Sequence, residues 1–237
     1  MKFARYYIGM AVIALASFAA DAEDKPDDAI PAAQKSYKEA IAKAEKALVE
    51  SFDTNAAAIR ESSKKAELKQ ALLDQIKQEK ADFEQHGWYP WSAQSRPALV
   101  AFIRDRMTAD KALSTAFDNV ADVHTKAKRD VAAAAVLRLK KEAIAPKMIA
   151  RWELTGTNWT GSWIGKLYSN GHYSDADGKA IWAIEKGVVT LRQPEQGYPN
   201  GVKVLKWSLK DSGTELDEVG NNGARSTGKL ANVPEEK

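Results

Sequence analysis

The chain has 237 residues, no cysteine and a formal net charge of +3. This length allows one large domain or two small ones. The missing cysteine excludes disulfides and the thiol to which bacterial lipoproteins attach their lipid. Lysines alternate with acidic residues, as in Lys43, Glu45 and Lys46, a pattern typical of a solvated helix face, and no nucleic-acid partner is expected.

The first 22 residues have the pattern of a cleavable secretory signal peptide. Lys2 and Arg5 precede an apolar stretch at residues 6–18, and Ala20-Asp21-Ala22 offers small residues for cleavage. The apolar stretch is too short for an ordinary membrane span, which needs about 20 residues. We expect cleavage after Ala22, with an alternative site after Ala19.

The expected mature protein is a periplasmic or secreted bacterial protein with no membrane attachment. Removal of Lys2, Arg5 and Asp21 leaves a formal charge of +2, which gives little attraction to an anionic surface. Without cysteine, the exported chain must depend on packing for its stability.

Residues 29–147 are predicted to form a helical domain. They are rich in Ala, Lys, Glu, Gln and Leu, which favour helices, and Gly87 is their one glycine. Apolar residues recur at steps of three and four, which places them on one helix face. They are Tyr37, Ile41, Ala44, Leu48 and Phe52, followed by Leu68, Leu72, Ile76 and Phe83. Between the two groups the pattern weakens at residues 51–63, where we expect the helix to continue.

A break is predicted at residues 86–91, which read His-Gly-Trp-Tyr-Pro-Trp. Ser95 is the expected N-cap of the next helix, with Pro97 in its first turn and Thr108 as a candidate for a fresh start. A later run of apolar positions has the heptad spacing of a coiled coil. It comprises Leu113, Phe117, Val120, His124, Ala127, Val131 and Ala134. The two helical arms should therefore form a long antiparallel hairpin.

The length of such a hairpin constrains the arrangement of the two domains. An unbroken arm of ~40 residues would extend about 60 Å. The aromatic loop would then lie at the far tip and the second domain at the opposite end. Unless the helices fold back on themselves, the loop and the second domain cannot share a binding site.

Residues 151–231 are predicted to form a small antiparallel β meander or barrel. Turn signals recur at short intervals, among them Asn170-Gly171, Asp211-Ser212-Gly213 and Asn221-Asn222-Gly223, and the segments between them alternate with a period of two. About six or seven strands follow from this spacing. The fold class is therefore α+β, a helical hairpin followed by this β domain, with a frayed tail at residues 232–237.

The β half resembles a small lipocalin-like domain. The resemblance rests on residues 152–154, on Trp159-Thr160-Gly161-Ser162-Trp163 and on the Asn170-Gly171 hairpin. Lipocalins have eight strands in about twice this length, so a deep ligand cavity is not implied. As a whole the chain is similar to exported bacterial proteins of unknown function that join a helical hairpin to such a domain.

Two aromatic groups are candidate binding surfaces. Trp88, Tyr89 and Trp91 would lower the solubility of the protein if they were exposed to water. They therefore either pack over the open end of the hairpin or contact a partner or ligand. The tryptophans of the β half lie on faces shared with aliphatic residues, so they either fill the core or form a stacking platform for a ring-shaped ligand. They are Trp159, Trp163, Trp182 and Trp207.

The turn at Asn170-Gly171 is a further candidate ligand site, with Tyr168 before it and His172 beside it. His172 is near Asp175 and Asp177, but no second histidine is near in sequence, and a metal site needs three or four ligands. We also find no catalytic motif, so no metal, cofactor or catalytic residue is expected.

The leading hypothesis is an exported, non-enzymatic binding or scaffold protein. Its helical hairpin would contact a partner or a second copy, and its β domain would bind a small ligand or another protein. The alternative is a periplasmic glycan-binding protein or a glycoside hydrolase. A hydrolase would place Asp175, Asp177 or Glu185 beside the tryptophans, because such enzymes use two carboxylates that face one groove.

Overall fold

The computed structural model describes residues 26–156, 162–174, 178–185 and 188–231. Within these ranges four helices are followed by seven antiparallel strands, so the predicted α+β class is confirmed. The expected signal peptide, Trp159, the pair Asp175 and Asp177, and the expected tail lie outside the described residues.

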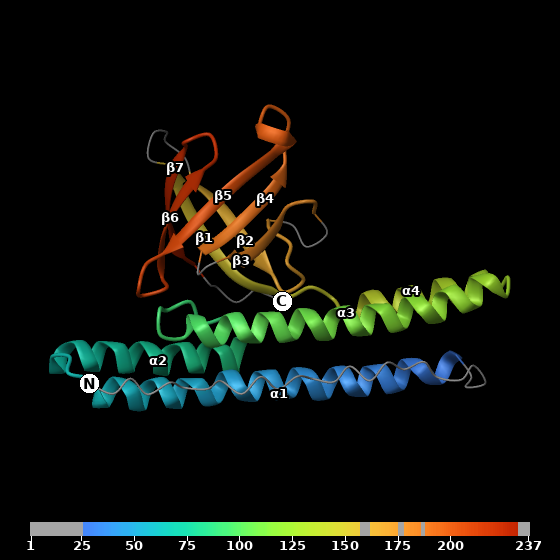
Figure 1. Ribbon diagram of the computed structural model, residues 1–237, viewed down its shortest axis with the longest axis horizontal. Helices are drawn as coiled ribbons and strands as arrows, with labels where there is room; N and C mark the ends of the chain where they lie inside the picture. The colour runs from blue at the N-terminus through green and yellow to red at the C-terminus, as the bar shows by residue number, and fades with distance from the viewer. Residues whose placement is uncertain (1–25, 157–161, 175–177, 186–187, 232–237) are drawn as a thin grey trace, which may run out of the picture.

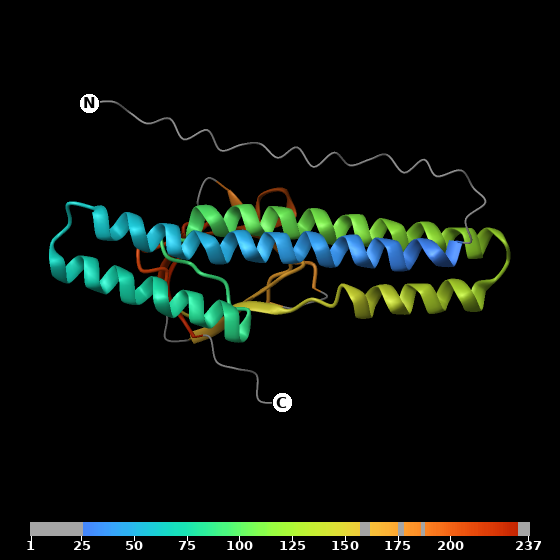
Figure 2. The same cartoon turned by 90° about the horizontal axis from the view of Figure 1, so that it is seen from below.

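The helices form one elongated layer. They are α1 (Pro26–Glu61), α2 (Ala66–His86), α3 (Arg96–Lys126) and α4 (Asp130–Ala143). α1 and α3 lie side by side along the layer, and α2 and α4 lie on the same side of this pair, one near each end (Figure 2). Each arm of the predicted hairpin is thus divided into two helices, and each folds back on its neighbour.

The helix breaks agree only in part with the prediction. The break at Gly87 is confirmed, because this residue has φ 71° and its N–H caps the last turn of α2. The expected continuity through residues 51–63 is wrong, since α1 ends at Glu61, where the Ser62 hydroxyl donates to the Ile59 carbonyl at 2.7 Å. The fresh start at Thr108 is also wrong, because α3 continues through it.

The predicted heptad seam is interrupted by the turn between α3 and α4. Leu113, Phe117, Val120 and His124 are buried as predicted, but Lys128 in the turn has a positive φ of 55°. Val131, which lies two seam positions after His124, is 87% exposed. α4 therefore buries a different face, which carries Ala133 and Val136.

The strands form one sheet, curled into a half-barrel. They are β1 (Met148–Gly156), β2 (Ser162–Tyr168), β3 (Ile181–Glu185), β4 (Val188–Pro194), β5 (Val202–Leu209), β6 (Glu215–Gly220) and β7 (Arg225–Leu230). The order is β2-β1-β7-β6-β5-β4-β3. Bridges from Tyr173 to Leu167 and from His172 to Ile181 link the two edge strands, so the short segment around His172 helps to close the barrel.

The barrel stands on the helical layer over the N-terminal part of α3 (Figure 1). The expected placement at the end of the hairpin, away from the aromatic loop, is therefore wrong. The helices fold back, and this brings the loop between α2 and α3 under the barrel. The same fold-back leaves α4 and the adjoining parts of α1 and α3 extending beyond the barrel.

Tryptophans fill the interior of the barrel. Trp152, Trp182 and Trp207 are buried, and the two glycines Gly165 and Gly228 make room for their large neighbours. A Cβ atom at Gly165 would lie 2.9 Å from the Trp207 ring. The core interpretation of these tryptophans is confirmed for Trp182 and Trp207, whereas Trp163 is half-buried. None of the described helices is both long and apolar enough to cross a membrane.

Candidate binding site at the junction of helices and barrel

The aromatic loop seals the end of the barrel that faces the helices. Trp91 is 1% exposed, and its ring meets those of Trp152 and Trp182 edge-on, with 6.4 Å between centroids in each pair. The Tyr89 N–H donates to the Ile149 carbonyl on β1 at 3.3 Å. Trp88 is half-buried at the margin. Edge-on aromatic packing of this kind stabilises the contact beyond the area it buries.

A carboxylate on α2 holds the loop in place. Glu79 accepts hydrogen bonds from the Ser92 N–H at 2.7 Å, from the Ser92 hydroxyl at 2.7 Å and from the Ser95 hydroxyl at 2.6 Å. Both serines are fully buried. Ser95 occupies the predicted N-cap position of α3, but its side chain bonds Glu79 and not the helix amides.

The turn between β5 and β6 completes the junction. Gly213 has φ 71°, and a Cβ atom there would collide with the backbone of Trp91 and Ser92. The Ala93 N–H donates to the Asp211 carbonyl at 2.9 Å. The Arg96 guanidinium donates to the carbonyls of Trp91 and Lys210, at 3.1 Å each. The close approach requires glycine at this position.

A small cleft of about 170 Å³ lies at this junction. α2, the aromatic loop and the barrel all contribute to its wall. The lining residues are Gln75, Gln78, Glu79, Asp82, Trp88, Tyr89, Trp91, Ser212, Gly213, Thr214 and Leu230. Ligand pockets for drug-sized molecules have about 300–1,000 Å³. The cleft therefore suits a single chemical group and not a large ligand.

Beneath the loop, four polar side chains meet between α1 and α3. The Tyr37 hydroxyl donates to Asp110 at 2.9 Å, and the Arg106 guanidinium lies 3.8 Å from the same carboxylate. Burial, followed by the charge of Asp110, raises the pKa of Tyr37 to about 12. Burial also raises the pKa of Tyr89 to about 12 and raises that of Asp110. These groups tie the loop to the long helices.

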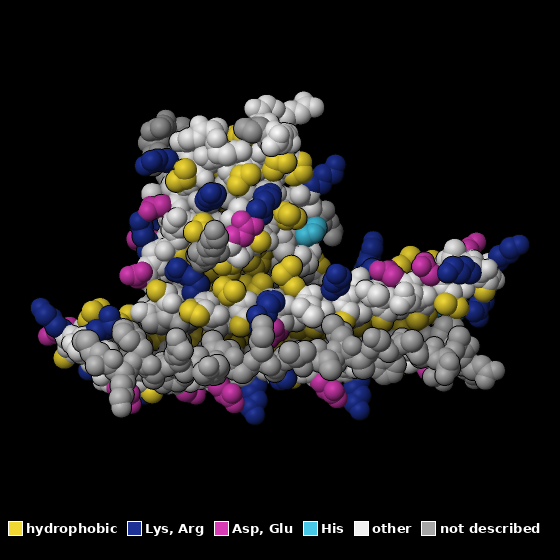
Figure 3. Space-filling model, in the orientation of Figure 1, with side chains coloured by type: hydrophobic (Ala, Val, Ile, Leu, Met, Phe, Trp, Pro, Cys, Tyr) yellow, Lys and Arg dark blue, Asp and Glu magenta, His cyan; other side chains and the backbone are white. Residues whose placement is uncertain are grey.

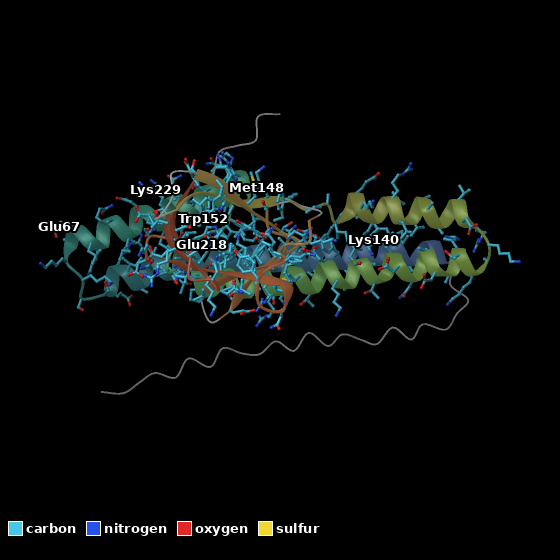
Figure 4. The ribbon with its side chains drawn as sticks, turned by 90° about the horizontal axis from the view of Figure 1, so that it is seen from above. Glu67, Lys140, Met148, Trp152, Glu218 and Lys229 are labelled. Atoms are coloured by element: carbon cyan, nitrogen blue, oxygen red, sulfur yellow. The ribbon has the colours of Figure 1, made fainter. Side chains whose placement is uncertain are left out.

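The interior of the barrel holds one buried carboxylate. The indole N–H of Trp207 donates to Glu218 at 2.7 Å, and the Tyr173 ring meets the Trp207 ring edge-on at 5.7 Å. Burial, and then the charge of Glu218, raises the pKa of Tyr173 to about 12. Seen from above, Trp152 and Glu218 both lie within the outline of the barrel, while Lys140 lies on the part of the helical layer beyond it (Figure 4).

A second cavity of about 240 Å³ lies at the rim of the barrel. Its described lining residues are Tyr173, Ser174, Gly178, Lys179, Ala180, Gln193 and Pro194. Neither cavity is a deep chamber inside the barrel, whose interior is filled by side chains.

The structure brings together some of the candidate residues. Trp88, Tyr89 and Trp91 meet at the junction. Tyr168 ends the edge strand β2, and His172 lies on the segment that links β2 to β3. The Tyr168 carbonyl accepts the indole N–H of Trp182 at 2.8 Å. Trp159 is not among the described residues.

Of the carboxylates considered for hydrolysis, Glu185 lies among the described residues, whereas Asp175 and Asp177 do not. Glu185 pairs with Arg192 at 2.6 Å, and Trp182 on the same strand is buried. No group of three or more His, Asp or Glu side chains in the described ranges is arranged to hold a metal ion.

Sequence reasoning missed the α2 side of the cleft. Gln78, Glu79 and Asp82 look like ordinary surface residues of a charged helix, and the turn at Ser212 and Gly213 gave only a hairpin signal. Their roles depend on the docking of the barrel.

Comparisons with protein-family models, curated proteins and solved structures found no significant match for this chain. The resemblance to lipocalin-like exported proteins therefore stays a prediction.

Proposed function

We propose that this chain is an exported, non-enzymatic binding or scaffold protein whose helical arm contacts a partner protein. The helical arm is α4 together with residues 26–40 of α1 and 108–126 of α3. The observation that supports this best is the exposure of apolar side chains on α4, in an arm that projects beyond the barrel.

The arm has a core of its own. This core is separate from that of the barrel and consists of Ile30, Leu113, Phe117, Val120, Ala121 and Val136. Lys140 and Asp118 join α4 to α3 at 2.7 Å. Charged side chains of both signs are spread along the helical layer, whereas apolar side chains gather on the lower part of the barrel (Figure 3). A separately packed arm can present a surface without disturbing the barrel.

The outer face of α4 has the spacing of a helix contact. Val131, Ala135 and Leu139 follow at steps of four and are exposed, with Val131 at 87%. α4 has 14 residues and is about 21 Å long. With a helix width of about 10 Å, one face covers ~200 Å². Each partner in a stable dimer buries about 800 Å², so this face is too small for such a dimer. The occupant we infer is therefore a helical segment of another protein in a transient contact.

A photo-cross-linking experiment tests this proposal. A photoreactive residue at Ala135 of the mature chain is expected to cross-link a helical segment of another protein in the native extract, with the site mapped by mass spectrometry. The double variant V131D/L139D should lose the adduct and remain folded, because both positions are exposed. V219D, at an exposed position on the barrel, is the matched control and should retain it.

Two results would count against the proposal. An adduct that survives in V131D/L139D would show that α4 does not select its partner. A cross-link between two copies, supported by a dimer in sedimentation, would replace the partner protein with self-association. Among the described residues, the burial of Trp182 and Trp207 and the pairing of Glu185 with Arg192 do not favour a glycoside hydrolase.

A further inference from the structure

The cleft at the junction takes no part in the proposed role of the arm. We propose that it binds a neutral acetamido group, which consists of a methyl group, an amide carbonyl and an amide N–H. Three features of the cleft support this ligand: hydrogen-bond donors that remain free, acceptors that remain free, and an apolar wall around a small volume. None of them depends on a partner at α4.

The cleft offers hydrogen-bond donors to the carbonyl oxygen. Trp91 lines it and is 1% exposed, and its indole N–H has no hydrogen-bond partner among the described residues. The Gln75 amide donates one N–H to the Ser212 carbonyl. The Gln78 amide likewise donates one N–H to Asp82 at 2.9 Å, so each amide keeps a second N–H. A buried donor without a partner costs free energy, so this wall favours a ligand that brings an acceptor.

The same wall offers acceptors to the amide N–H. Asp82 accepts from Gln78 through one carboxylate oxygen, and its second oxygen remains available. The amide oxygens of Gln75 and Gln78 are available as well. Glu79 is not counted, because its oxygens already accept from the two serines of the loop. The complement of this wall is therefore a ligand that both donates and accepts.

Apolar side chains complete the wall and suit a methyl group. Trp88, which is half-buried, and Leu230, the last residue of β7, line the cleft together with Tyr89 and Trp91. The volume of about 170 Å³ equals that of about five water molecules at ~30 Å³ each. An acetamido group fits this volume, whereas a larger body that carries the group would stay outside the cleft, beside Trp88.

Charged ligands fit this chemistry less well. An alkylammonium group only donates hydrogen bonds, so it would leave the Trp91 N–H unmet. A carboxylate only accepts, and it would lie beside Asp82 and Glu79. None of the described lining residues is a lysine or an arginine that could offset this repulsion. A neutral group with one donor and one acceptor avoids both problems.

A titration of the mature chain with three probes of the same shape tests the proposal. N-methylacetamide has the full acetamido group. Methyl acetate keeps the carbonyl but lacks the N–H, and ethylmethylammonium keeps N–H donors but lacks the carbonyl. N-methylacetamide is expected to bind at least about 5-fold more tightly than either of the others, because each of them loses a hydrogen bond. Equal binding of either one would overturn the proposal.

The NMR signals of the indole N–H groups report where the probe binds. The Trp91 signal should move downfield, because its N–H gains an acceptor. The N–H groups of Trp182 and Trp207 already donate, to the Tyr168 carbonyl and to Glu218, so their signals should stay in place. Binding of N-methylacetamide without a shift of the Trp91 signal would overturn the proposal.

A matched pair of variants on α2 locates the binding in the cleft. Asp82 and Asp74 each accept an amide N–H at 2.9 Å from the glutamine four residues earlier. Asp82 lines the cleft, whereas Asp74 is not among its lining residues. Asp82→Ala is expected to weaken binding of N-methylacetamide by about 5-fold, and Asp74→Ala should leave it unchanged. Equal effects would refute the assignment, with circular dichroism used to confirm that each variant is folded.

N-acetylglucosamine separates two sources of the acetamido group. Binding more than about 10-fold tighter than that of N-methylacetamide would identify an N-acetylated amino sugar as the ligand, with its ring outside the cleft. Equal affinity would identify a small acetylated molecule of another kind. Either result supports the site. Binding of N-acetylglucosamine no tighter than that of glucose, or no binding of either acetamido compound at up to about 100 mM, would overturn it.

Discussion

The Glu79 carboxylate on α2 lies 2.6 Å from the hydroxyl of Ser95 at the start of α3. The same carboxylate also bonds the N–H and hydroxyl of Ser92, so one side chain connects two helices and the loop between them. Trp91 in this loop reaches the tryptophans of the barrel. The position of the barrel therefore depends on a hydrogen-bonding centre in the helical layer.

Glu79→Gln should destabilise the protein. The amide keeps one acceptor but places an N–H₂ group against donors of Ser92 and Ser95, which leaves buried polar groups unsatisfied. We expect a loss of about 1–3 kcal/mol in the free energy of unfolding, measured in urea. Glu84→Gln on the exposed face of α2 should change it by less than about 0.5 kcal/mol. Equal stability of the two variants would contradict the role given to Glu79.

The variants Gly213→Ala and Gly223→Ala distinguish the effect of close packing on stability from the effect of backbone strain. Both glycines have positive φ, 71° and 83°, so both variants are strained by about 1 kcal/mol or more. A Cβ atom at Gly213 collides with the loop backbone, whereas nothing lies within 4 Å of one at Gly223. Gly213→Ala should therefore lower the melting temperature by clearly more than Gly223→Ala. Similar shifts would show that the turn does not dock as described.

The boundary between the two halves of the fold could be predicted from the sequence because composition changes there. Helix formers end near Lys147, and Gly, Trp and Thr follow. The turn at residues 62–65 could not be predicted in this way. It contains no glycine or proline, and the fold-back depends on the packing of α2 against α1.

The candidate site was harder to predict, because it exists only after docking. The aromatic loop stood out in the sequence as Trp88, Tyr89 and Trp91. Its partners Glu79 and Gly213 lie on different elements, and no local pattern marks them. Likewise, the lysine at position 128 does not predict the positive φ at which the heptad seam ends.

The export prediction is tested at the N-terminus. The expected cleavage after Ala22 gives a chain that begins at Glu23, which mass spectrometry of the protein expressed in a bacterial host would detect. Ala22→Glu should block this cleavage, because the site requires small residues. A mature chain that begins at Ala20 would favour the alternative site. Retention of Met1 in the cytoplasm would contradict export.

Two buried tyrosines should make stability fall at high pH. Burial raises the pKa of both Tyr89 and Tyr173 to about 12 in the folded protein, against about 10 in the unfolded chain. The folded state therefore retains both protons between these values, while the unfolded state loses them. Their contribution is fully present below pH ~10 and is lost as the pH rises from about 10 to about 12, with a slope of up to about 1.4 kcal/mol per pH unit for each group.

Phenylalanine variants attribute this loss to the two residues. Tyr89→Phe and Tyr173→Phe should each make the fall in unfolding free energy above pH 10 less steep, and each should remove one late step from the tyrosinate absorbance titration of the folded protein. Phenylalanine keeps the ring contacts, such as that of Tyr89 with Phe102 at 5.3 Å. The pKa of Tyr37 is also raised to about 12, so both variants should retain its late step. If Tyr173→Phe removed no late step, the barrel interior would be more open to solvent than its packing indicates.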